Sequence, residues 1–133
     1  MNKAEFESML EKYADVIIRV GLNLQKGQRL TISATVEENG FVRKLVESAY
    51  KAGAVYVDVW IFDEMLDRIR FLHAAPETIT EFPDWRLARF EEYRSRGDAH
   101  LSIASEDPDI FSGIDSDLIA KNRKATSEKF GPV

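Results

Sequence analysis

Apolar residues recur along the chain with two different periods. Three short runs rich in β-branched and aromatic residues predict β-strands at residues 30–34, 54–62 and 99–104. Around these runs, apolar residues recur every three or four positions, which predicts helices. The predicted helices cover residues 2–21, 35–53, 63–72, 85–93 and 118–129, with a further helix start at Pro76. The order of elements is therefore α-βα-βαα-β-α.

Four predicted helices begin at a residue whose side chain can accept a hydrogen bond from a free backbone N–H group. These residues are Asn2, Thr35, Asp63 and Asp115. Glu5 and Glu38 follow three residues after the first two and would complete capping boxes. Pro76 and Pro83 fit the first turn of a helix, where the missing N–H group costs nothing.

Strands that alternate with helical crossovers favour a parallel sheet with right-handed connections. We therefore expect an α/β fold of three layers, a mainly parallel sheet of at least three strands with helices on both faces, similar to a Rossmann fold. The length of 133 residues predicts a single domain over residues 1–133. The pattern ends on a helix where a fourth strand would be usual, so the sequence reads as truncated.

Composition narrows the class of protein further. Apolar residues make up 44% and charged residues 31%, which is typical of a soluble globular domain. The absence of cysteine is consistent with a reducing compartment, and we expect a cytoplasmic protein. A net charge of −5 disfavours nucleic acid as a partner, and no apolar run is long enough to predict a membrane span.

The carboxyl ends of the predicted strands carry polar side chains, and open parallel sheets bind ligands beyond that edge. The end of the first strand carries Ser33 and Thr35, and Ser105 follows the third strand. Four acidic residues are the candidates for the rim of a cleft: Asp63, Glu64, Glu106 and Asp107. They could bind a divalent cation or an amine, or they could begin helices by capping free N–H groups. We favour the second interpretation, because each acid falls close to a predicted helix start.

Other kinds of site find little support in the residues. The junction SATVEENGF has one glycine and two glutamates, which disfavours a phosphate-binding turn. A receiver-like phosphorylation domain would need an acidic pair after the first strand and five strands. His73 and His100 lack the spacing of metal ligands, and we expect structural or solvent-facing roles for both. We assign no catalytic, cofactor-binding or metal-binding residue.

Five segments in the same order resemble the start of the metal-dependent aminopeptidases of the aminopeptidase T and aminopeptidase S type. They are LEKYADVII, VGLNLQKGQ, FVRKLVESAYKAGAVYVDV, DEMLDRIRFLHAAPE and LSIASEDPDIF. The turn GLNLQKGQ and the segment SEDPD are the most specific of them. The resemblance covers about residues 4–128 of the chain.

The resemblance implies a metalloaminopeptidase that removes N-terminal residues from peptides and uses two divalent metal ions, zinc, cobalt or magnesium. Members of that family are typically homodimers, and their metal ligands and catalytic residues lie in a C-terminal part that nothing in this chain resembles. The chain is thus expected to be an N-terminal, non-catalytic domain, inactive alone, whose partner is its own C-terminal catalytic domain. The alternative is an independent small α/β binding or regulatory module without peptidase activity.

Overall fold

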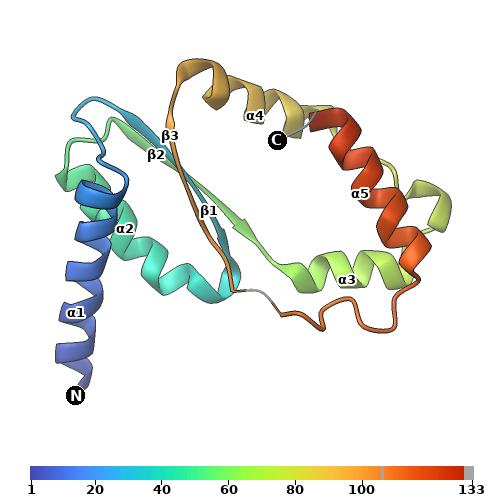
Figure 1. The fold of residues 1–133 in the computed structure, drawn as a ribbon, viewed down its shortest axis with the longest axis horizontal. Helices are drawn as coiled ribbons and strands as arrows, with labels where there is room; N and C mark the ends of the chain where they lie inside the picture. The colour runs from blue at the N-terminus through green and yellow to red at the C-terminus, as the bar shows by residue number, and fades with distance from the viewer. Residues whose placement is uncertain (106, 131–133) are drawn as a thin grey trace. The chain divides into compact units, whose positions relative to one another are not determined.

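The computed structural model describes residues 1–105 and 107–130 (Figure 1). The elements are α1 (Lys3–Val16), η1 (Ile17–Gly21), β1 (Arg29–Thr35), η2 (Val36–Glu38), α2 (Asn39–Lys51), β2 (Tyr56–Phe62), α3 (Glu64–His73), η3 (Pro76–Thr78), α4 (Asp84–Arg96), β3 (Ala99–Ile103) and α5 (Ser116–Phe130). They form two compact units, residues 1–62 with 97–105, and residues 63–96 with 107–130. The single domain expected from the length stays a prediction.

The first unit contains the sheet. Its strands lie in the order β2-β1-β3, and β1 pairs with both neighbours in parallel. Ile32, in the middle of β1, lies opposite Val59 on one side and Leu101 on the other. The predicted α/β class with three parallel strands is confirmed.

One face of this sheet is apolar and carries the hydrophobic core. Alternate residues of β1, Leu30, Ile32 and Ala34, are almost completely buried on it. Helix α2 packs on β1 and β2 and α1 packs on α2, so both helices lie on the same side of the sheet (Figure 1). Ile18 and Leu45 close the core from the helices. Each such side chain contributes about 1.5–3 kcal/mol of burial free energy.

The opposite face of the sheet is polar and aromatic. The alternating residues that share it are Thr31, Ser33 and Thr35 of β1, Asp58, Trp60 and Phe62 of β2, and His100 and Ser102 of β3. Parallel strands buried on both faces usually read as continuous apolar runs, because both sets of side chains are dehydrated. In this sheet β1 and β3 alternate apolar with polar residues, and β2 alternates aliphatic residues with Asp58, Trp60 and Phe62. Register places Asp58, Thr31 and His100 in one row across it.

The two predicted capping boxes have different outcomes. Asn2 Oδ1 accepts a hydrogen bond from the Glu5 N–H group at 2.8 Å, which confirms Asn2 as the cap of α1, while the Glu5 carboxylate accepts from the Asn2 side-chain amide at 3.3 Å. The second is wrong, because Thr35 makes no side-chain capping bond and a 3-10 turn separates it from α2. The hydroxyl of Thr35 and the carboxylate of Glu38 have other partners at the edge of the sheet.

The second unit is held together by side chains that bind backbone carbonyl groups. Arg68 Nη1 donates to the carbonyls of Ile110 and Ser112 at 2.7 and 2.9 Å. Arg70 Nη2 donates to the carbonyls of residues 78, 79 and 81. Asn122 of α5 also donates to the carbonyl of Ile79, whose side chain is buried.

Among the described residues, no helix is long and apolar enough to cross a membrane.

Two glycines allow the turn before β1 to lie against the end of α2. The Gly27 N–H group donates to the Gly53 carbonyl at 2.8 Å, and both glycines have positive φ, +85° and +103°. A Cβ atom on Gly53 would lie 2.9 Å from Lys26 Cγ and 3.1 Å from Lys26 Cα, whereas one on Gly27 would meet no atom within 4 Å. Gly53 is therefore constrained by both conformation and space.

This difference predicts unequal costs for two alanine substitutions. Gly27→Ala should lower the free energy of unfolding by about 1–2 kcal/mol, the cost of a left-handed conformation with a Cβ atom. Gly53→Ala should lower it further, because the backbone near Lys26 must also move. Urea unfolding of both variants measures the difference, and equal losses would contradict the role of this close approach.

Candidate functional site

The carboxyl edge of the sheet is the first place to look for a site. All three strands run in parallel, so Thr35, Phe62 and Ile103 end at the same edge. In open α/β sheets, ligands bind in the crevice beyond this edge. The sequence placed Ser33, Thr35 and Ser105 there, and the structure brings Thr35 and Ser105 into contact.

Thr35, Glu38 and Ser105 form a hydrogen-bonded cluster at this edge. The Ser105 N–H group donates to Thr35 Oγ1 at 2.8 Å, and the Ser105 hydroxyl donates to the Glu38 carboxylate in a short contact. Thr35 is buried, with 6% of its surface exposed. The cluster ties the residues after β3 to the end of β1 and to η2.

The hydrogen bonds of this cluster connect parts of the chain to one another. The Thr35 hydroxyl satisfies a backbone N–H group, and the Glu38 carboxylate accepts from a serine hydroxyl. Sequence analysis missed this role of Glu38, because a T-x-x-E pattern before a helix also describes a capping box. The arrangement acts as a structural clamp that fixes where the chain leaves β3.

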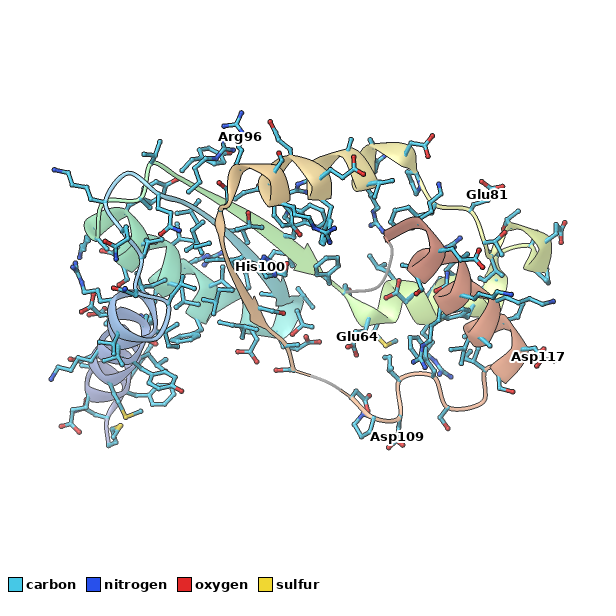
Figure 2. All side chains as sticks on the ribbon, turned by 45° about the horizontal axis from the view of Figure 1, so that its top comes forward. Glu64, Glu81, Arg96, His100, Asp109 and Asp117 are labelled. Carbon is cyan, nitrogen blue, oxygen red and sulfur yellow. The ribbon has the colours of Figure 1, made fainter. Side chains whose placement is uncertain are left out.

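The acids predicted to line the rim have separate structural roles. Asp63 Oδ1 accepts from the Met65 N–H group at 3.0 Å, which confirms Asp63 as the cap of α3. Glu64 lies in the first turn of the same helix (Figure 2), where a negative charge meets the positive end of the helix dipole. Glu106 lies outside the described residues.

The prediction that Asp107 begins a helix is wrong. Its Oδ1 accepts from the Asp109 N–H group at 2.9 Å, and its carbonyl accepts from the Ile110 N–H group at 3.2 Å. These bonds form a turn, and the next helix, α5, begins only at Ser116 after Asp115 (Figure 2). An aspartate stabilises a turn as readily as a helix start, because both need an acceptor for an N–H group two residues on.

The described residues do not fit the divalent metal ions that the resemblance implies. In residues 1–105 and 107–130, no three histidine, aspartate or glutamate side chains gather closely enough to hold a metal ion. Asp63, Asp107 and Asp115 instead accept hydrogen bonds from backbone N–H groups. Metal chemistry therefore has no donor set among these residues.

The second unit contains a cavity of about 190 Å³ that sequence analysis did not anticipate. Its lining includes Asp67 and Arg70 of α3, Arg86 of α4 and Arg123 of α5. Partial burial raises the pKa of Asp67, and this outweighs the nearby Arg86 and Arg70, which lower it. The spacing of apolar and charged residues could not reveal the cavity, because charged residues on each of three helices predict only a solvent-exposed face of that helix.

Comparison with known proteins places this architecture in a family. Residues 6–133 match the thermophilic metalloprotease family M29. The chain belongs to the M29 metallopeptidase family. It is 38% identical to aminopeptidase 2 of Geobacillus stearothermophilus over 128 residues and 36% identical to aminopeptidase AmpS of Bacillus subtilis over 123 residues.

The M29 relatives are much longer than this chain. The matches cover 96% and 92% of the chain but about 30% of each relative. The solved structure of AmpT from Thermus thermophilus superposes with a TM-score of 0.87 at 34% identity, over 94% of this chain and 32% of that one. The α/β fold described above is therefore shared with a member of the M29 family.

The edge cluster predicts a measurable loss when Thr35 loses its hydroxyl. Thr35→Val keeps the shape of the side chain but leaves the Ser105 N–H group without its acceptor. The free energy of unfolding should fall by about 0.5–1.5 kcal/mol, the net contribution of one hydrogen bond, because Ser105 is exposed and water can replace the lost acceptor. Amide hydrogen exchange at Ser105 should also become faster.

Thr31→Val provides the matched control for this experiment. Thr31 lies on the same face of β1 with only 2% of its surface exposed, but the Ser105 N–H group donates to Thr35 and not to Thr31. We expect little or no loss of stability from this change. An equal loss in both variants would show that replacing a buried hydroxyl by a methyl group, and not losing the bond to Ser105, causes the destabilisation.

The raised pKa of Asp67 predicts a pH-dependent effect on stability. The Asp67 carboxyl binds its proton more tightly in the folded state than in the unfolded chain. Protonation of Asp67 therefore stabilises the fold fully below the ordinary pKa of 3.8, and this stabilisation is lost as the pH rises through the pKa of the folded state. Asp67→Asn should therefore raise the Tm at pH 7 by about 1–4 °C, because solvent screening keeps the effect small.

The same gain should disappear below pH 3.8, where the carboxyl is protonated in both states. Glu77→Gln removes one negative charge from an exposed position in the same unit and serves as the control. Thermal unfolding at pH 3 and pH 7 tests both variants. A lower Tm for Asp67→Asn at pH 7 would mean that the arginines outweigh burial.

Proposed function

We propose that the chain is the N-terminal, non-catalytic region of a metal-dependent aminopeptidase that removes N-terminal residues from peptides. Membership of the M29 family supports the chemistry, and the names of the relatives support the exopeptidase class. The chain corresponds to about 30% of those relatives, which leaves ample length elsewhere for a catalytic domain. Its role in such an enzyme is to support that domain and to help wall the peptide cleft.

The hydrogen bonds made by the acidic side chains support the non-catalytic role. Asp63 caps α3, Asp107 closes a turn and Glu38 accepts from Ser105. A metal site needs several carboxylate or imidazole groups around one ion, and no three such side chains gather in residues 1–105 and 107–130. We infer that the two divalent ions of the enzyme are bound by its C-terminal domain. We further propose a cytoplasmic homodimer, consistent with a chain that lacks cysteine.

An activity assay on the chain alone tests this role. We expect no hydrolysis of leucyl-p-nitroanilide with zinc, cobalt or magnesium added, because the chain supplies no metal site. The full-length Bacillus subtilis relative, assayed in parallel, is the positive control. Metal-dependent turnover by the chain, above the rate with the chelator EDTA, would contradict the proposal.

A chimera tests whether the chain belongs in an aminopeptidase. The segment of the Bacillus subtilis relative that matches this chain is replaced by this sequence, with which it shares 36% identity. We expect the chimera to fold and to keep metal-dependent hydrolysis of leucyl-p-nitroanilide. A folded chimera that binds metal but has no activity would favour the alternative, an independent binding or regulatory module.

A further inference from the structure

Three arginines from three different helices line the cavity in the second unit. Arg70 comes from α3, Arg86 from α4 and Arg123 from α5, and Asp67 is the one carboxylate among the lining residues. Three positive charges against one negative charge leave an excess of two positive charges. Phe71 and Phe111, in edge-to-face contact at 5.2 Å, form part of the apolar wall.

The arginines at this cavity keep donors available. Arg70 is held in place by three carbonyl groups that all accept from Nη2, so its Nε and Nη1 groups remain for another acceptor. Arg86 stacks over the rings of Phe82 and Trp85 at 5.8 and 5.7 Å. Within the described part of the chain, neither Arg86 nor Arg123 forms an ion pair with a carboxylate.

Anchored guanidinium groups favour anions for two physical reasons. A planar guanidinium presents paired donors that match the oxygens of a carboxylate or phosphate. Because Arg70 is already fixed by the backbone, less side-chain entropy is lost when an anion binds. The aromatic wall lowers the local dielectric constant and so strengthens each charged interaction.

The size of the cavity limits what can bind. Its volume of about 190 Å³ lies below the roughly 300–1,000 Å³ of pockets that enclose drug-sized ligands. It exceeds the roughly 30 Å³ that one water molecule occupies in the liquid. A compact oxyanion fits this volume, whereas a folded peptide or a nucleotide does not.

We propose that this cavity, between α3, α4 and α5, is a binding site for a compact oxyanion, either the carboxylate of a small molecule or peptide end, or inorganic phosphate. Arg86 and Arg123 contribute charge and donors, and Arg70 contributes fixed donors. Asp67 competes with the ligand for the same guanidinium groups. The site goes beyond the proposed role in an aminopeptidase and does not depend on it.

Nuclear magnetic resonance titration of the full ¹⁵N-labelled chain tests the site. Sodium phosphate and N-acetylglycine are added separately at pH 7, with chloride adjusted to keep the ionic strength constant. We expect saturable shifts of the amides of Phe71, Asn122 and Arg123 with one or both anions. The anion that binds more tightly identifies the chemical class of the natural ligand, a phosphate or a carboxylate. Shifts that do not saturate with either anion would overturn the proposal.

Substitutions at the cavity make the test specific. Arg123→Gln should weaken binding by roughly tenfold, equivalent to about 1.4 kcal/mol. Lys124→Gln removes the same charge from the next residue of α5, which does not line the cavity, and should leave the affinity nearly unchanged. Equal weakening by both variants would indicate attraction to the whole surface and would contradict a defined site.

Asp67→Asn separates a ligand site from an internal ion-pair network. If Asp67 competes with the ligand, its neutralisation should tighten the binding of the preferred anion. If the arginines serve only to hold Asp67, the same change should leave anion binding undetectable. Spectra of each variant without ligand confirm that the unit remains folded.

Discussion

The fold of the first unit depends on a core that lies on one side of a parallel sheet. Leu30, Ile32 and Ala34 point to the same face, and α2 and η1 cover it through Leu45 and Ile18. Because side chains alternate along a strand, this leaves the other face to threonine, serine, aspartate, histidine and aromatic residues. A shift of one residue in register would exchange the two faces, so the pattern also fixes the pairing of all three strands.

That constraint explains why the polar residues of the sheet edge serve structure. Once β1 and β3 are parallel neighbours, the chain must leave both at the same edge with unpaired backbone groups. Thr35 accepts from the Ser105 N–H group and Glu38 accepts from the Ser105 hydroxyl, while Asp63 accepts from an N–H group in the first turn of α3. An N–H group without an acceptor costs free energy, and the Thr35 hydroxyl and the Asp63 carboxylate accordingly bind backbone N–H groups.

The sequence was sufficient for the main helices and strands and for their order along the chain, because both follow from the periods of apolar residues, but the order β2-β1-β3 within the sheet was not predicted. Asn2, Asp63 and Asp115 were also predicted correctly as helix caps, since each precedes a helix directly. The sequence was insufficient at Thr35 and Asp107, where a hydroxyl or carboxylate near a free N–H group is compatible with more than one local structure. A hydroxyl or carboxylate near a free N–H group can cap a helix, close a turn or bind a distant strand end, and only the tertiary structure decides among them.

The arginines of α3 illustrate how a motif can be specific without being catalytic. In DEMLDRIRFLHAAPE, Arg68 and Arg70 lie two residues apart, and each binds carbonyl groups of a different loop, one before α5 and one after η3. A lysine could not replace them, because a single ammonium group lacks the planar donors that reach several carbonyls at fixed angles. The same rigidity that orders the loops also holds one guanidinium at the wall of the cavity. Loop anchoring and anion recognition thus use one chemical property of arginine, and the first makes the second less costly in entropy.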